Sequence, residues 1–159
     1  MGLLEPDAGH GRGDGEAGLT AAGGERAVEV RSSAEALTAA DAAAALGRPL
    51  LLVSPRGGAA SFGPAMFAAI VERARARHDA TRGLLDCEEA EGHVLLALRV
   101  GIDAVIYKGP DFVREKLAAI AACEGRRVLA ERPPALVLHR ERDPIAACRR
   151  WLAQPEISH

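Results

Sequence analysis

The apolar residues of this chain fall into short runs that alternate with stretches of helical periodicity. Each run is rich in Val, Leu or Ile and is bounded by Gly, Pro or charged residues, which predicts strands over residues 26–30, 49–53, 82–85, 102–107, 127–130 and 135–138. Apolar residues at helical spacing predict helices over residues 33–46, 64–78, 88–100, 112–123 and 144–151. Capping residues support these bounds: Ser32 or Ser33 and Asp143 at amino ends, and Gly47, Gly101 and Gly125 at carboxyl ends.

Strands that alternate with helices predict a single α/β domain over residues 25–159, in which right-handed crossovers connect mainly parallel strands. We expect a small three-layer sandwich with a sheet of about five strands, and a flavodoxin-like order is one option for those strands. Residues 1–24 are rich in Gly, Ala and acidic residues and have no apolar period. They predict a disordered Gly-rich tail, because such a segment buries too little surface to offset its ordering entropy.

Composition excludes several classes of function. A net charge of −2 gives no basic field, which argues against a general nucleic-acid binder. No stretch approaches the roughly 20 apolar residues of a membrane span, and the first residues lack the pattern of a secretory signal. We therefore expect a cytoplasmic protein without membrane association. Aromatic residues make up only 3% of the chain, so the core is expected to consist of Ala, Leu, Val and Ile.

The cysteines and histidines do not predict a metal site. Cys87, Cys123 and Cys148 are widely spaced and odd in number, so neither a disulfide framework nor a paired-cysteine zinc site is expected. Buried free thiols are the favoured interpretation. The five histidines share no ligand spacing with one another or with a cysteine. No metal and no cofactor is predicted.

Polar residues follow three of the predicted strands, at the edge where open α/β sheets bind ligands. The loop at residues 54–63 is the first candidate, because glycines between a strand and a helix let backbone N–H groups approach an anion. An acidic residue follows the next strand, and a lysine follows the one after. The candidate ligand-binding residues are Ser54, Arg56, Gly57, Gly58, Ser61, Asp86 and Lys108.

Each of these candidates has a purely structural alternative. The loop has Pro64-Ala65 where a nucleoside-triphosphatase loop has Lys followed by Ser or Thr, so it predicts weak anion binding or a plain strand-to-helix connection. Lys108 is either a phosphate contact or a solvated lysine at a strand end. Asp86 is either a catalytic carboxylate or the N-cap of the helix at residues 88–100, with Glu89 as its capping-box partner. Cys87 at the same helix start is a weak nucleophile candidate, because the neighbouring carboxylates disfavour its thiolate.

Two helices have more apolar positions than one buried stripe requires. Leu95 and Leu96 widen the apolar face of the helix at residues 88–100, and the final helix contains Trp151, the only tryptophan. These side chains predict either ordinary packing in the outer layer of the domain or a surface for a protein partner or a second copy of the chain.

The segment from Arg48 to Leu138 resembles a group of short bacterial α/β proteins that has no assigned activity. The resemblance rests on the loop after Ser54 and on three short motifs: Leu85-Asp86-Cys87, Ala97-Leu98-Arg99 with Gly101, and Arg132-Pro133-Pro134-Ala135-Leu136. It implies the fold only.

Two functional hypotheses follow from the residues. The first is a non-catalytic binding or regulatory module that acts through protein contacts. The alternative is a small enzyme or binder of an anionic, phosphorylated metabolite that uses the loop at residues 54–63 and Lys108. Whether the protein is an enzyme stays open.

Overall fold

The computed structural model describes residues 25–155. The predicted tail, residues 1–24, and the last four residues lie outside this range. The strands are β1 (Arg26–Glu29), β2 (Leu50–Val53), β3 (Thr81–Asp86), β4 (Ala104–Ile106), β5 (Arg127–Leu129) and β6 (Ala135–Val137). The helices are α2 (Ser33–Leu46), α3 (Gly58–Ser61), α4 (Pro64–Arg77), α5 (Glu91–Arg99), α6 (Asp111–Ala122), the 3-10 helix η2 (Leu138–Arg140) and α7 (Pro144–Ala153).

The six strands form one parallel sheet in the order β5-β4-β3-β2-β1-β6. The predicted α/β fold with a mainly parallel sheet is therefore confirmed, with six strands where about five were expected. The order differs from that of flavodoxin, 2-1-3-4-5. From β1 to β5, each new strand pairs with the strand before it, and the sheet grows in one direction. Only the last strand, β6, returns to the other side of β1.

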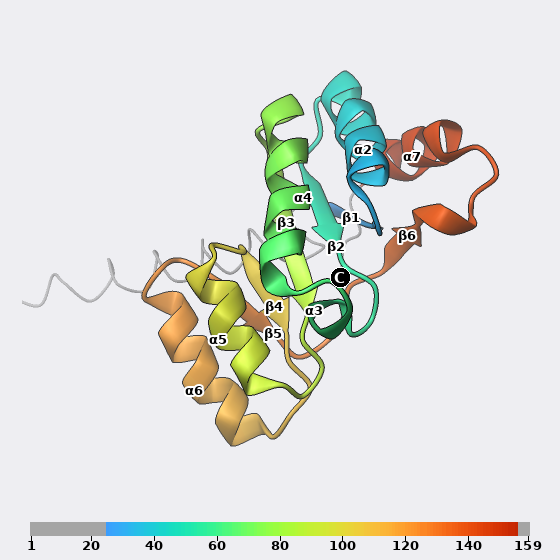
Figure 1. The fold of residues 1–159 in the computed structure, drawn as a ribbon. Coiled ribbons are helices and arrows are strands. Elements are labelled where there is room, and N and C mark those ends of the chain that lie inside the picture. Colours follow the sequence, from blue (N-terminus) through green and yellow to red (C-terminus); the bar gives the residue numbers. More distant parts are fainter. Residues whose placement is uncertain (1–24, 156–159) are drawn as a thin grey trace, which may run out of the picture.

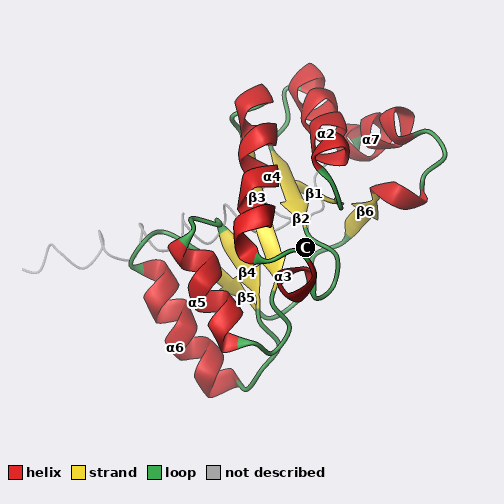
Figure 2. Cartoon of the chain, in the orientation of Figure 1, coloured by secondary structure: helices red, strands yellow, loops and turns green. Residues whose placement is uncertain are grey.

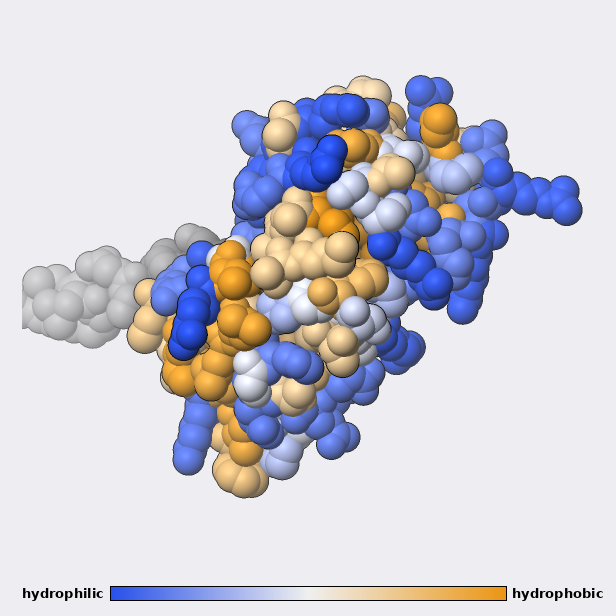
Figure 3. Space-filling model, in the orientation of Figure 1, coloured by the Kyte–Doolittle hydropathy of each residue, from blue (hydrophilic) through white to orange (hydrophobic). Residues whose placement is uncertain are grey.

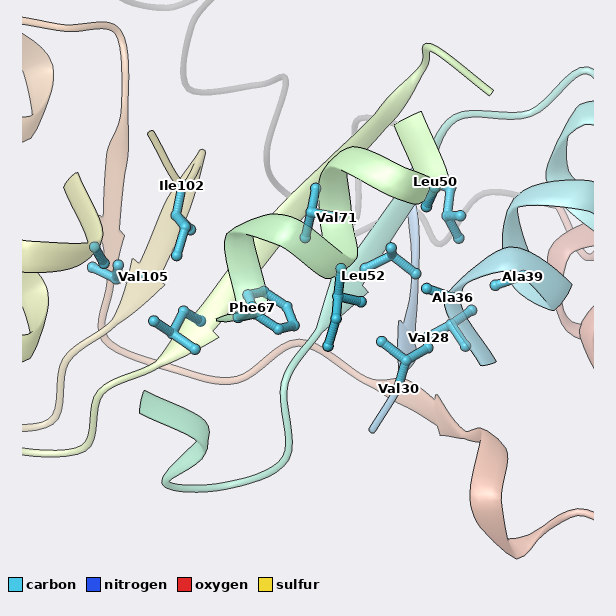
Figure 4. Close-up of a cluster of buried hydrophobic side chains, with 14 of the residues drawn as sticks. Val28, Val30, Ala36, Ala39, Leu50, Leu52, Phe67, Val71, Ile102 and Val105 are labelled. Carbon is cyan, nitrogen blue, oxygen red and sulfur yellow. The ribbon is translucent and has the colours of Figure 1, made fainter. Parts of the chain in front are cut away.

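Because these crossovers run in one direction, the helices pack side by side over one face of the sheet. Helices α7, α2, α4, α5 and α6 contact one another in this order (Figures 1 and 2). In the same order, they pack on β1, β2, β3, β4 and β5. The main hydrophobic core lies between helices and sheet. Figure 4 shows Phe67 and Val71 of α4 on the side of the sheet where Leu52 projects from β2.

Small residues bring the helices close to the sheet. The buried face of α2 consists entirely of alanines, which lets this helix pack tightly against α4 and α7. Gly83 of β3 has a similar role beneath α4, because a Cβ atom there would lie 2.7 Å from a methyl group of Val71. Ser32 and Asp143 cap α2 and α7 with their side chains, as predicted.

The opposite face of the sheet holds a second, smaller core, which is made of strand residues, with Leu129 of β5 and Ala135 of β6 packed against it. The chain from Leu129 to Ala135 reaches at most about 21 Å when fully extended. The edges of a flat six-stranded sheet are about 24 Å apart. The sheet must therefore curve so that its two edge strands, β5 and β6, approach each other. Residues 130–134, which we call the strap, join these edges.

None of the helices in the described residues is both long enough and apolar enough to cross a membrane.

Candidate binding pocket

A pocket of about 640 Å³ opens at the carboxyl ends of β1, β2 and β6. This volume lies in the range of pockets that bind small molecules. Its wall combines the residues after β1 and β2, the second half of the strap, β6 and η2. The lining residues are Glu29, Arg31, Pro55, Arg56, Arg132, Pro133, Pro134, Ala135, Val137 and Arg140.

Four arginines line this pocket, and they come from four different segments of the chain. Arg31 follows β1, Arg56 follows β2, Arg132 lies in the strap and Arg140 ends η2. The sheet brings them together, because β1 has β2 on one side and β6 on the other, so all three strands end at one place. Glu29 is the one acidic residue of the lining.

Arg132 differs from the other three arginines because its guanidinium group already has three acceptors within the protein. It donates hydrogen bonds to Glu29 Oε1 at 2.6 Å, to Asp86 Oδ2 at 3.0 Å and to the backbone oxygen of Ser54 at 2.5 Å. These acceptors belong to β1, β3 and the residue after β2. Arg132 therefore fastens the strap to three neighbouring strands of the sheet.

The carboxylates around Arg132 outnumber its single positive charge. Its side chain is 10% exposed, that of Glu29 is 12% exposed and that of Asp86 is fully buried. One fully buried and one partly buried carboxylate thus surround one guanidinium group, so this cluster has an excess negative charge and no positive charge left for a ligand. It forms the rigid base of the pocket.

The other three arginines provide the free positive charge of the pocket. Arg31, Arg56 and Arg140 are exposed, and within residues 25–155 no side-chain or backbone oxygen accepts a hydrogen bond from their guanidinium groups. Each guanidinium group offers donors in a planar fork that matches a phosphate or carboxylate. Three such groups around one pocket form an arrangement suited to an anion.

Ser54 and Asp86 of the predicted set lie together, but their side chains form hydrogen bonds within the protein. The buried Ser54 hydroxyl accepts a hydrogen bond from the Asp86 N–H at 3.0 Å and donates one to the Pro55 backbone oxygen at 2.9 Å. Gly58 packs directly on this serine, since a Cβ atom at Gly58 would lie 2.4 Å from Ser54 Oγ. The glycine is therefore needed for close packing of the loop.

The predicted N-cap role of Asp86 is wrong. Helix α5 begins three residues later than expected, at Glu91, and its N-cap is Ala90, which makes no side-chain capping bond. Asp86 Oδ1 instead accepts the N–H of Glu88, whose φ is 53°, and Oδ2 accepts Arg132. The ion pair with Arg132, which is distant in sequence, holds the Asp86 carboxylate at the end of β3. Helix α5 begins further along the chain, without a cap from Asp86.

The remaining predicted residues lie outside the pocket lining, apart from Arg56. Lys108 is exposed, and its backbone N–H donates to the Glu88 oxygen at 2.7 Å. Gly57 adopts a left-handed conformation with φ 68° as the N-cap of α3, and the exposed Ser61 bonds back to it. The predicted loop therefore contributes one arginine and a backbone scaffold to this pocket.

The cysteines do not offer an activated thiol in the pocket. Cys87 is buried, and burial together with the Asp86 charge raises its pKa to about 12. Burial likewise raises the pKa of Cys148 to about 11. Cys123 is exposed, so the prediction of a buried thiol is wrong there, because this residue ends α6 on its outer side. No group of metal-ligating side chains occurs within residues 25–155.

Sequence reasoning missed Glu29, Arg31, Arg132 and Arg140. A signal existed for Arg31, which directly follows a predicted strand as Ser54 and Lys108 do. For Arg132 and Arg140 the sequence contained no such signal, since their position depends on β6 returning beside β1.

Comparisons of the sequence with protein-family models and with curated proteins found no match. The resemblance to a group of short bacterial α/β proteins therefore stays a prediction.

Proposed function

We propose that the protein binds an anionic small molecule, of the phosphorylated-metabolite class, in the pocket at the carboxyl ends of β1, β2 and β6. The main support is that three arginines without an acceptor in the described residues, Arg31, Arg56 and Arg140, line one pocket of about 640 Å³. This proposal keeps the ligand class of the second sequence hypothesis and replaces most of its residues.

The electrostatics of the pocket favour an anion over a neutral ligand. Like charges repel, so a cluster of three guanidinium groups gains most from a shared anion that neutralises them. Arginine forms paired, charge-assisted hydrogen bonds to phosphate oxygens, each contributing about 1.5–3 kcal/mol. The carboxyl edge of a parallel sheet is also where α/β proteins commonly bind their ligands.

The proposal is a binding function, and we assign no reaction to the pocket. Both Asp86 oxygens accept hydrogen bonds inside the protein, and Glu29 is ion-paired with Arg132. A general acid or base has to reach a substrate proton, and Asp86 is fully buried.

A thermal-shift experiment tests the proposal. Orthophosphate, a panel of phosphate esters and citrate are added to the protein at constant ionic strength, with chloride as the reference. A ligand at about 100 times its Kd adds about 2.7 kcal/mol of stability, which raises Tm by several degrees in a domain of this size. If no anion in the panel raises Tm, the proposal is overturned.

Two variants locate the bound anion. Arg56→Gln and Arg140→Gln should each remove most of the shift while leaving the unliganded Tm nearly unchanged. Arg73→Gln is the matched control, because Arg73 is exposed on α4, outside the pocket lining, and has no side-chain partner in the described part of the chain. Binding that survives both pocket variants would place the anion elsewhere.

A second candidate function, binding of a protein partner, has its own supporting observation. Large apolar side chains are exposed on α5, at its carboxyl end and on the neighbouring helix α6: Leu95, Leu96, Val100, Phe112 and Ile120. Figure 3 shows hydrophobic residues gathered over these two helices. Trp151 is not part of this surface. Its indole donates to the Ala27 oxygen at 2.8 Å, and Arg26 covers its ring.

This second proposal is tested by sedimentation of the wild type and of Leu96→Lys. If the apolar surface joins two copies of the chain, the wild type sediments as a concentration-dependent oligomer and the variant as a monomer. A wild type that stays monomeric at high concentration would exclude a homo-oligomer through this surface. A different partner protein would then be the remaining occupant.

A further inference from the structure

We propose that the ligand is a sugar phosphate or polyol phosphate, with its phosphate held by Arg31, Arg56 and Arg140 and a hydroxyl group of its organic part donating to Glu29. This inference rests on the proposed function and names the chemical class that the same pocket selects. Three features of the pocket support it: its size, its one acidic side chain and its proline wall.

The pocket has room for more than an inorganic anion. A single water molecule takes about 30 Å³ of liquid volume, and a phosphate ion is only a few times larger. The pocket measures about 640 Å³. An ion bound by the arginines would leave room beside it, so the pocket can also take an organic group attached to the phosphate.

Glu29 gives the pocket an acceptor beside its donors. The carboxylate has room for about four hydrogen bonds. In the described residues the hydrogen bond that it accepts comes from Arg132, at 2.6 Å. Its side chain lines the pocket and is 12% exposed, so the remaining acceptor capacity faces the cavity. Asp86, by contrast, is fully buried and bonded at both oxygens.

This acceptor distinguishes a hydroxyl-bearing ligand from a simple alkyl phosphate. A partly exposed carboxylate that loses water on binding without gaining a donor destabilises the complex, whereas a ligand hydroxyl replaces the lost water. A second phosphate near Glu29 would be repelled. The pocket therefore favours a molecule with one anionic end and one end with hydroxyl donors.

The strap supplies the apolar part of the wall. Pro133 and Pro134 have no backbone N–H, so neither residue donates a backbone hydrogen bond to an anion. Their rings, with Pro55, Ala135 and Val137, offer C–H surface instead. The carbon face of a sugar ring fits such a surface while its hydroxyls point to polar groups.

Titration calorimetry with three kinds of probe tests this inference. The sugar phosphates glucose 6-phosphate, fructose 6-phosphate and ribose 5-phosphate are compared with butyl phosphate and with orthophosphate, all at the same ionic strength. We expect at least one sugar phosphate to bind ten-fold or more tightly than both butyl phosphate and orthophosphate. If butyl phosphate binds as tightly as every sugar phosphate, the inferred ligand class is overturned while the proposed anion site stands. If none of the probes binds, the proposed function fails as well.

Glu29→Gln tests the named acceptor. The variant removes the negative charge, so orthophosphate should bind as well as before or better, whereas the preference for the sugar phosphate over butyl phosphate should fall at least five-fold. An unchanged preference in a folded variant would overturn the role of Glu29. If the variant does not fold, the probe series on the wild type decides the ligand class alone, and Arg73→Gln again serves as the control.

Discussion

The arginines at the two ends of the sheet differ in their hydrogen-bond partners. At the amino ends of the strands, Arg75 donates to Asp103 at 2.7 Å and to the Thr81 backbone oxygen at 3.0 Å, and Arg126 donates to the Gly101 oxygen at 2.8 Å. At the carboxyl ends, three exposed arginines share a pocket without any such acceptor in the described residues.

This difference separates arginines that stabilise the fold from arginines available to a ligand. An arginine with carboxylate and carbonyl partners lowers the free energy of the folded state. An arginine that lines a pocket with others of the same charge gains no such stabilisation, and the proposed anion would supply the missing acceptor. Arg132 is the exception at the carboxyl end, because it is paired as completely as the amino-end arginines.

The largest effect is expected at Arg132. Arg132→Met keeps an unbranched side chain but removes the positive charge that pairs with Glu29 and the fully buried Asp86. Leaving such a carboxylate unpaired costs about 3–5 kcal/mol, so urea unfolding should show a loss of that order. A loss below about 1 kcal/mol would mean that the strap is not fastened through this residue.

The next effect is a pH dependence at the amino end. Burial raises the pKa of Glu25 to about 7, against the attraction of Arg82 and with a contribution from the charge of Asp103. The unfolded chain ionises this group near 4.5 while the folded protein keeps it protonated, so its contribution to stability falls as pH rises from 4.5 to 7.

Glu25→Gln should therefore be more stable than the wild type at pH 8, by about 2–3 kcal/mol, and similar to it at pH 4. Urea unfolding at both pH values measures the two differences. Equal stability at pH 8 would show that the carboxyl group ionises in the folded protein without a penalty.

A smaller effect compares one arginine from each end of the sheet. Arg75→Ala removes a partly buried guanidinium group with two carboxylate partners and a carbonyl partner, and should cost about 1–2 kcal/mol. Arg56→Ala should change stability by less than about 0.5 kcal/mol, because Arg56 has no partner to lose in the described residues. Equal losses measured by urea unfolding would remove the distinction between the two ends.

The sequence predicts the elements well where local signals decide them. The caps at Ser32 and Asp143 and the bounds of α2 agree with the structure, because capping and alanine periodicity are local properties. The start of α5 is predicted three residues too early, since a long-range ion pair removes Asp86 from its capping role.

The pocket is harder to predict because it depends on strand order. Arg56 is identified from its place after a buried strand, and Arg31 follows the neighbouring strand β1, but Arg140 joins them only because β6 returns beside β1. Arg132 and Glu29, which this arrangement brings together, are 103 positions apart in the chain. No periodicity in the sequence indicates such a distant pairing, so the strap and its arginine appear only in the folded structure.

The most direct test is titration of a phosphate ester into the wild type and into a variant that combines Arg31→Gln, Arg56→Gln and Arg140→Gln. Each lost charge-assisted hydrogen bond weakens binding by about ten-fold or more, so the combined variant should bind at least 100-fold more weakly at an unchanged Tm. Binding as tight as that of the wild type, or a large loss of Tm in the unliganded variant, would contradict the account that these three arginines are free to bind an anion.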